Sequence, residues 1–287
     1  MLNESIMTKL NEQALAHLSL GKSTEYKTEY DASLLQAVPR QLARDIIGLA
    51  ADQALPFVGY DVWHAYELSW LTHKGKPMVA LATVTVPCDS PNLVESKSFK
   101  LYLNSFNQSR FKDITELYQA LTRDLSACAG APVQVTLHHV NELGSFQPTW
   151  LPGRCLDELD IEFHEYQYNP KLLKTLDTAS VVEEKLHSHL LKSNCLITSQ
   201  PDWASVFIHY KGQALCHESV LRYLVSFRMH NEFHEQCVER IYWDLYQLLN
   251  PEFLAVYACY TRRGGLDINP LRSSEPYTPP SIRLTRQ

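Results

Sequence analysis

The sequence predicts an α+β protein built from two similar modules. Short β-prone runs and helical stretches follow the order strand, strand, helix, strand, and this order occurs twice in the 287 residues. Pro77 and Pro201 begin corresponding segments 124 positions apart, and Leu103 and Leu224 open similar four-residue runs 121 positions apart. We therefore expect antiparallel sheets with helices on one face.

The first half predicts strands at 66–71 and 78–86, joined by a turn. The second of these runs is rich in β-branched residues, which favour strands. A helix is expected over 111–125 and a third strand at 133–137. The helix has one apolar face at helical spacing, made of Phe111, Ile114, Leu117, Tyr118, Leu121 and Leu125. Upstream, a short helix is expected at 14–20, followed by an extended arm.

The second half predicts strands at 204–210 and 253–260, on either side of a helix. The apolar face of that helix is expected to consist of Phe233, Cys237, Ile241, Leu245 and Leu248. In the connection, residues 160–168 alternate as an extra strand would, and residues 181–191 predict a short helix or the entry to a strand.

The predicted boundary gives an N-terminal module with an extended arm at 1–150 and a C-terminal module at 151–287. This division agrees with the usual domain size of roughly 100–200 residues. Two such sheets leave open edges, which favour pairing within the chain and across a homodimer.

The composition is that of an ordinary globular protein, with 45% hydrophobic and 20% charged residues and a formal net charge of −6. No Lys/Arg-rich block is present, so no direct nucleic-acid partner is expected. No signal-peptide core or membrane span is evident. The seven cysteines include no Cys-x-x-Cys pair, which favours reduced thiols in the cytoplasm.

The sequence is organised around the stretch from Ser193 to Trp203, which carries Cys195 and Asp202. Residues 195–198 are β-prone, and Pro201 presets a turn before the strand at 204–210, which would fold Asp202 back toward Cys195. A thiol nucleophile beside a carboxyl group suits covalent chemistry with proton delivery. The alternative from the residues alone is a half-buried cysteine beside a turn aspartate.

Three further segments carry candidate functional side chains. Glu95, Ser96 and Lys97 combine a carboxylate, a hydroxyl and an ammonium group, and the last two can bind phosphate oxygens. The run from His230 to Cys237 offers an acceptor for a purine edge, or a zinc face at His230, His234 and Cys237. Arg263 and Gly264 suit close approach to a phosphate. The alternatives are, respectively, a solvated corner, an amphipathic helix and a basic turn.

Several familiar motifs are missing from the sequence. There is no Gly-x-Gly-x-x-Gly after a strand, no Walker loop, no His-Glu-x-x-His and no Gly-x-Ser-x-Gly. The residues by themselves therefore lead only to a two-module α+β protein with a candidate cysteine active site.

The same segments resemble the NADPH-dependent 7-cyano-7-deazaguanine reductases, the nitrile reductases of queuosine biosynthesis, in their long two-module form. The resemblance spans residues 20–270. It rests on the runs Leu20–Thr24, Tyr30–Leu35, Glu95–Gln108, Leu190–Thr198, Gln200–Trp203, Phe233–Cys237 and Tyr260–Pro270. It implies tandem tunnelling-fold modules of ferredoxin-like type, and the reduction of a nitrile to an aminomethyl group with two NADPH in a tRNA modification pathway.

The resemblance also implies a role for each candidate residue. Cys195 is the nucleophile that forms a covalent thioimide, Asp202 the proton donor, and His234 a second proton relay. The deazaguanine is held by Glu235 and Glu95, with Val94, Ser96 and His234 beside it. NADPH is bound by Ser96, Lys97, Arg263 and Gly264. No metal is assigned, and the site is expected where the modules meet.

Two other functions stay open at this point. One is a zinc-dependent cyclohydrolase or pterin synthase of the same fold, with His230, His234 and Cys237 as ligands. The other is a non-catalytic purine-binding protein. A regulatory disulfide between Cys195 and Cys237 is a further hypothesis, because Cys237 lies close in sequence to the expected substrate residues.

Overall fold

The computed structural model describes residues 26–141, 147–177, 181–280 and 283–287. They form two compact units. Of these residues, unit 1 comprises 26–55, 62–141 and 263–266, and unit 2 comprises 56–61, 147–177, 181–262, 267–280 and 283–287. The helix expected at 14–20 lies outside the described residues.

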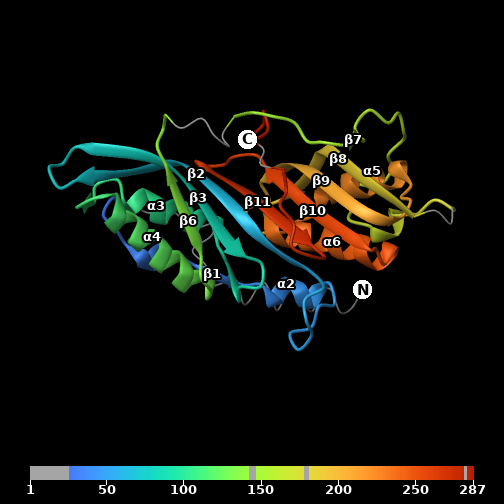
Figure 1. The fold of residues 1–287 in the computed structure, drawn as a ribbon, viewed down its shortest axis with the longest axis horizontal. Helices are drawn as coiled ribbons and strands as arrows, with labels where there is room; N and C mark the ends of the chain where they lie inside the picture. Colours follow the sequence, from blue (N-terminus) through green and yellow to red (C-terminus); the bar gives the residue numbers. More distant parts are fainter. Residues whose placement is uncertain (1–25, 142–146, 178–180, 281–282) are drawn as a thin grey trace. The chain divides into compact units, whose positions relative to one another are not determined.

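Unit 1 contains a sheet in the order β6-β3-β2, in which β3 and β6 are antiparallel. Helices α3 and α4 lie on one side of these strands (Figure 1). The elements are η1 (Ala32–Leu34), β1 (Ala37–Pro39), α2 (Gln41–Ile46), β2 (Val58–Thr72, whose first residues belong to unit 2), β3 (Pro77–Pro87), β4 (Asn92–Val94), α3 (Ser96–Ser105), β5 (Arg110–Phe111), α4 (Ile114–Ala129) and β6 (Gln134–His138).

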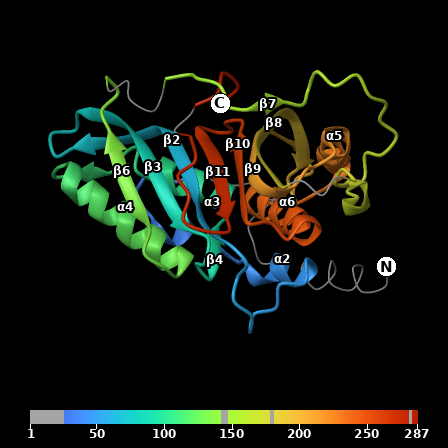
Figure 2. The same cartoon turned by 45° about the vertical axis from the view of Figure 1, so that its right-hand side comes forward.

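Unit 2 contains the strand order β11-β10-β9-β8-β7, with antiparallel pairing from β11 to β8 and parallel pairing of β7 with β8. Helices α5 and α6 pack on this sheet (Figure 2). The elements are β7 (Arg154–Cys155), η3 (Pro170–Leu172), β8 (Val181–Asn194), β9 (Pro201–Gln213), α5 (His217–Ser226), η4 (Phe227–Met229), α6 (His234–Leu249), β10 (Phe253–Tyr260) and β11 (Leu266–Ser273).

The predicted repeat is present in the hydrogen bonds as well as in the element order. In unit 1 the hydroxyl of Tyr102 donates to Asp124 at 2.7 Å, and in unit 2 the hydroxyl of Tyr223 donates to Asp244 at 2.5 Å. These four side chains occupy corresponding places on α3, α4, α5 and α6. Each pair joins the two helices of its unit through a buried tyrosine.

A second tyrosine joins each of these aspartates from the segment before the hairpin. Tyr30 donates to Asp124 at 2.6 Å, and Tyr168 donates to Asp244 at 2.8 Å. The repeat therefore starts earlier than the sequence suggested. The 3-10 turns η1 and η3 open it, capped by Asp31 and Asn169.

Four details of the sequence prediction are wrong. Residues 160–168 form no strand, and the turn of the second hairpin covers 195–200 rather than following Pro201, which starts β9. The helix predicted at 111–125 begins only at Ile114, because Asp113 accepts hydrogen bonds from the amides of Thr115 and Glu116 as its N-cap. The expected apolar faces also fail at their margins, since Ile114, Tyr118 and Leu248 are exposed.

The structure confirms the predicted α+β class, with antiparallel strands and helices on one face of the sheet in each unit. The strand expected at 253–260 is present with the predicted ends, and those expected at 78–86, 133–137 and 204–210 are present with different ends. Among the described residues, no helix is both long and apolar enough to cross a membrane.

Candidate active site

Cys195 is the first residue of the tight connection between β8 and β9. Its amide donates to the carbonyl of Gln200 at 2.8 Å, and the amide of Ser199 donates to the carbonyl of Cys195 at 3.0 Å. Ser199 closes the turn with a φ of 54°, in the left-handed region. The turn thus holds the half-exposed Cys195 in a defined position just beyond the end of β8.

Asp202 is brought back toward Cys195 by the register of this hairpin. Asp202 lies directly opposite Ser193, two residues before Cys195. Directly opposed residues of an antiparallel pair point to the same face of the sheet. The carboxylate is therefore buried beside the last residues of β8, with only 3% of its side chain exposed.

His234 comes to Asp202 from the first position of α6. Its Nε2 atom lies 3.3 Å from Oδ2 of Asp202. The imidazole stacks on the ring of Tyr260, with centroids 3.9 Å apart and planes inclined by 19°. Its Nδ1 atom is buried and makes no hydrogen bond to any described residue. The pair can exchange a proton at Nε2 and keeps one further nitrogen for another partner.

The loop before α6 is tied to the hairpin by Asn194. The amide of Asn194 donates to the carbonyl of His230, and its carbonyl accepts from the amide of Glu232. The side chain of Asn194 accepts from Lys192 at 2.5 Å and donates to Asn231 at 3.0 Å. These bonds fix the start of α6, and therefore His234, against the strand that leads to Cys195.

A buried ion pair stabilises the same loop. Two guanidinium nitrogens of Arg240 donate to Glu232, the shortest contact being 2.7 Å, and the imidazole of His230 lies 3.0 Å from the same carboxylate. Burial raises the pKa of Glu232, but Arg240 and His230 outweigh it and hold the pKa at about 2. Glu232 is thus an ionised acceptor across the physiological range.

Lys192 is a site residue that the sequence analysis did not single out. Its ammonium group donates to Asn194 and to the carbonyl of Arg228 at 2.6 Å. Burial and the charge of Arg228 lower the pKa of Lys192, although Asp202 acts in the opposite direction. The sequence pattern could not have indicated it, because Lys192 stands directly opposite Trp203, and alternation along the strands directs both to the other face from Ser193 and Asp202.

Glu235 and Cys237 lie in the first turn and a half of α6, and both are buried. Burial, followed by the charge of Glu232, raises the pKa of the Cys237 thiol to about 12. A thiol of this kind is a poor partner for disulfide exchange, which needs a thiolate. This burial argues against the hypothesis of a regulatory bridge to Cys195.

The alternative zinc face is not assembled in the described part of the chain. His230 is bound to Glu232, and His234 to Asp202. Among the described residues, three metal-ligating atoms converge only at Cys155, His187 and His189. The spacing of His230, His234 and Cys237 on a helix was therefore a weak indicator.

The predicted substrate residues Val94, Glu95 and Ser96 lie in unit 1, where β4 ends and α3 begins. The Glu95 carboxylate caps α3, accepting hydrogen bonds from the amides of Lys97 at 2.8 Å and Ser98 at 2.7 Å. Burial raises the pKa of Glu95 in spite of these bonds. Since a carboxylate has about four acceptor sites, Glu95 can cap the helix and still accept from a ligand.

The two predicted cofactor segments meet in unit 1. Gly264 adopts a φ of 57°, and a Cβ atom there would lie 2.6 Å from the side chain of Lys100 on α3. The turn that contains Arg263 therefore lies against the helix whose first turn carries Ser96 and Lys97. A glycine is required both for the positive φ and for this close approach.

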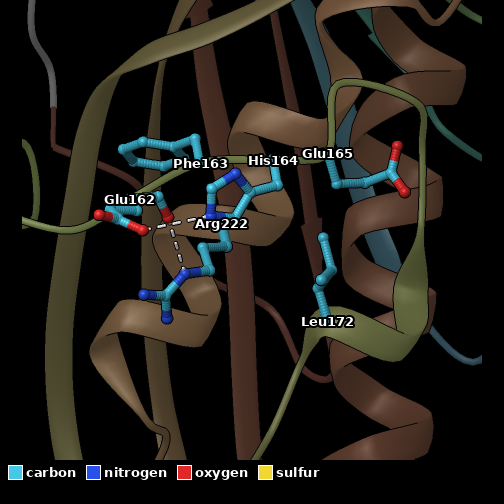
Figure 3. A pocket seen from close by; sticks show the side chains of 6 residues that line it. All are labelled: Glu162, Phe163, His164, Glu165, Leu172 and Arg222. Atoms are coloured by element: carbon cyan, nitrogen blue, oxygen red, sulfur yellow. Dashed lines mark hydrogen bonds and ion pairs between the residues drawn. The ribbon is translucent and has the colours of Figure 1, made fainter.

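A pocket of about 120 Å³ lies elsewhere in unit 2 (Figure 3). It is lined by residues of the connection before β8 and of α5, namely Glu162, Phe163, His164, Glu165, Leu172 and Arg222. None of the predicted site residues lines it. The Nε2 atom of His164 lies 3.3 Å from the Glu162 carboxylate, and the guanidinium of Arg222 donates to the carbonyl of Glu162 at 3.2 Å.

Comparison with known proteins identifies the family of both halves. Residues 26–137 match the model "Nitrile reductase, 7-cyano-7-deazaguanine-reductase N-term", and residues 201–278 match the model "QueF-like protein". Among solved structures, the chain is similar to the archaeosine synthase QueF-Like in the apo form, at 19% identity, 36% coverage of this chain, 100% coverage of that chain and a TM-score of 0.30. That likeness is too low to carry an argument.

The first matched segment includes Val94, Glu95, Ser96 and Lys97, and the second includes Asp202, His234, Glu235, Arg263 and Gly264. Together the two segments cover most of the residues in both units. The chain belongs to the 7-cyano-7-deazaguanine nitrile reductase family, in its long two-module form.

Proposed function

We propose that this protein reduces the nitrile of 7-cyano-7-deazaguanine to an aminomethyl group with two NADPH, through a covalent thioimide on Cys195, in queuosine biosynthesis. The observation that carries the proposal is the arrangement around one hairpin. A half-exposed thiol stands at its turn, and a buried carboxyl group paired with an imidazole lies beside it. Family membership supplies the substrate class.

In the first step, the Cys195 thiolate attacks the nitrile carbon. A carbon–sulfur bond forms, one carbon–nitrogen π bond breaks, and its electron pair moves to the nitrogen. The nitrogen takes a proton from the pair formed by Asp202 and His234, whose Nε2 and Oδ2 atoms are 3.3 Å apart. The product is a thioimide, which is more easily reduced than the nitrile.

Two hydride transfers complete the reduction. The first converts the thioimide carbon to a tetrahedral centre, from which the Cys195 thiolate departs to leave an imine. The second reduces the imine to the amine. The nitrile thus gains two hydrides on carbon and two protons on nitrogen, which balances four electrons. In this proposal the same buried pair of Asp202 and His234 also passes the second proton.

NADPH supplies the hydrides, and the turn at Arg263 and Gly264 fits a group that carries phosphates. Gly264 has a positive φ and no side chain, so the side chain of the cationic Lys100 lies directly against its backbone. Lys97 stands one turn earlier on α3. In this proposal Arg263, Ser96 and Lys97 hold phosphate oxygens, since guanidinium, hydroxyl and ammonium groups donate to them.

Recognition of the deazaguanine falls to Glu95 and Glu235. Both are buried carboxyl groups that begin a helix, and a carboxylate can accept two hydrogen bonds from the amidine edge of a purine-like ring. Val94, Ser96 and His234 complete the contacts. We further propose modules at 1–150 and 151–287, a homodimer, and a cytoplasmic location.

The test combines two measurements on the purified protein. The near-ultraviolet absorbance of NADPH should fall with a stoichiometry of two per nitrile, and intact-protein mass spectrometry without NADPH should detect the nitrile bound to Cys195. Both signals should vanish in Cys195→Ala and persist in Cys216→Ala. The control is matched, because Cys216 is also partly buried and lies in unit 2.

Two results would contradict the proposal. Binding of the nitrile without adduct or NADPH oxidation would indicate a purine-binding protein without this chemistry. Oxidation that persists in Cys195→Ala would remove Cys195 from the mechanism.

A further inference from the structure

A second cluster of reactive side chains lies in unit 2, apart from the residues of the proposed reaction. Cys155, His187 and His189 each place one ligand atom within 4.8 Å of the others. A tetrahedral zinc ion with Zn–N and Zn–S bonds of about 2.0–2.3 Å separates its ligand atoms by roughly 3.3–3.8 Å. Small rotations of the side chains would therefore bring the three atoms to bonding distance.

The backbone holds the three residues in place. Cys155 on β7 pairs with His187 on β8 in parallel register, and the amide of Leu156 donates to the carbonyl of His187 at 2.9 Å. His187 and His189 are two residues apart on β8, and a β-bulge between Ser188 and Leu191 shifts the register at His189. Their ring centroids are 5.4 Å apart.

Gly153 allows β7 to approach β8 this closely. Its φ is 85°, and a Cβ atom there would lie 2.2 Å from the carbonyl oxygen of Lys185. No other residue fits without moving the chain. The short strand that carries Cys155 is thus fixed by a specific backbone contact rather than by chance proximity.

Neighbouring groups orient the two imidazoles as metal ligands require. Nδ1 of His187 lies 3.0 Å from the carbonyl oxygen of Pro152. A carbonyl can only accept, so Nδ1 carries the proton and the lone pair of Nε2 remains available. Nδ1 of His189 lies 2.7 Å from the hydroxyl of Ser205. Hydrogen bonds of this kind are typical of the groups that surround a metal site.

A carboxylate stands beside the cluster without being used as a ligand. Asp157 accepts hydrogen bonds from the hydroxyl of Ser188 at 2.6 Å and from the amide of His189 at 2.9 Å. It holds the backbone between the two histidines and places a negative charge near the site. Such a charge favours a bound cation.

We propose that Cys155, His187 and His189 bind a Zn²⁺ ion, with water in the fourth position. Zinc prefers thiolate and imidazole ligands, whereas Mg²⁺ prefers oxygen ligands such as carboxylates and would bind weakly to these three side chains. The ion fastens the segment before β8 onto the strand that leads to the hairpin of Cys195. It takes no part in the proposed reduction, so zinc content by itself does not distinguish a reductase from a cyclohydrolase.

The experiment uses the full chain, stripped of metal with a chelator and titrated with Co²⁺ and then Zn²⁺. We expect one Co²⁺ per chain, a thiolate-to-cobalt charge-transfer band that Zn²⁺ displaces, and a higher melting temperature with Zn²⁺. Cys155→Ser should abolish the band. His189→Ala should weaken Zn²⁺ binding by at least about 10-fold, since even the groups behind a ligand are worth that much.

Control variants separate this site from the other thiols. Cys216→Ser and Cys195→Ala should keep the band and the affinity, because neither residue belongs to the cluster. Circular dichroism of each variant checks that it is folded. A band that survives in Cys155→Ser, or that disappears in Cys195→Ala, would place the metal elsewhere. Absence of stoichiometric binding to the parent protein would overturn the proposal.

Discussion

The Nε2 atom of His234 and the Oδ2 atom of Asp202 lie 3.3 Å apart, in a pair with 14% and 3% of the two side chains exposed. The two residues come from different elements, β9 and α6, and are 32 positions apart in the sequence. Their contact gives the candidate site a buried proton donor and acceptor next to the thiol-bearing turn. It is the basis of the first prediction.

Asp202→Asn should lower the rate of nitrile reduction by about 100- to 10,000-fold, the usual contribution of a positioned acid or base. His234→Ala should lower it less, because Asp202 keeps a carboxyl group at the same place. Stopped-flow measurement of NADPH oxidation under single turnover tests this order. A larger loss in His234→Ala than in Asp202→Asn would make the imidazole the direct donor.

The ion pair of Glu232 and Arg240 should contribute to the free energy of unfolding. Arg240→Met leaves a buried carboxylate without its main partner and should lower the free energy of unfolding by about 3–5 kcal/mol. Urea denaturation at neutral pH measures the loss. The double variant Glu232→Gln with Arg240→Met is the matched control, since it removes both charges and should recover part of the stability.

The same pair predicts a specific response to acid. Because the folded-state pKa of Glu232 is held at about 2, below its ordinary value, its contribution to stability is present at neutral pH. That contribution is lost as the pH falls from about 4.5 towards 2. Unfolding free energies over this range should fall less steeply in Glu232→Gln than in the parent protein. Equal slopes would show that the carboxylate is not held ionised in the folded state.

The effect of Glu95 ionisation on folding stability should have the opposite sign to that of Glu232. Burial raises its pKa, so the folded state favours the protonated form, and ionisation of Glu95 costs stability as the pH rises. Glu95→Gln should therefore keep or raise the melting temperature at neutral pH while raising the KM for the nitrile. Calorimetry and steady-state kinetics on the same preparation test both parts. A lower melting temperature would mean that the cap on α3 needs the charge.

Gly264→Ala should raise the KM for NADPH more than it affects the KM for the nitrile. The new Cβ would meet Lys100 at 2.6 Å, and the positive φ costs an alanine roughly 1 kcal/mol. Gly75→Ala is a matched control, since Gly75 has a φ of 82° in a turn of unit 1 and its nearest contact is the side chain of Arg110. Equal effects of the two variants on NADPH would remove Gly264 from the cofactor site.

Comparison of the two units shows how the repeat diverged. Helices α4 and α6 begin at Ile114 and His234, and strands β3 and β9 begin at Pro77 and Pro201, which makes Met78 the counterpart of Asp202. Unit 1 therefore has apolar residues where unit 2 carries the proton-transfer pair. Conversely, Glu95 caps α3 with its side chain, whereas its counterpart Cys216 makes no capping bond on α5. Each unit therefore carries only some of the predicted site residues.

The α+β class, the repeat and the hairpin of Cys195 could all be predicted from the amino-acid sequence. These features depend on patterns between near neighbours, namely β-prone runs in β3 and β9 and helical periodicity in α4 and α6. The family resemblance could also be identified from the sequence, because the family's motifs are present as short contiguous runs. The ends of elements were less certain, as at Asp113, whose capping bonds depend on local geometry.

The contacts between polar groups of different elements could not be predicted, because they depend on how the elements pack. The link between Asp202 and His234, the pair of Glu232 and Arg240, and the convergence of Cys155 on the histidines of β8 all join residues whose spacing fits no local motif. Burial at the edges of the apolar helix faces could not be predicted either, since Leu248 and Ile114 have the expected periodicity but are exposed to solvent. Periodicity fixes the direction of a side chain on its own helix, whereas its neighbours are set by how the elements pack.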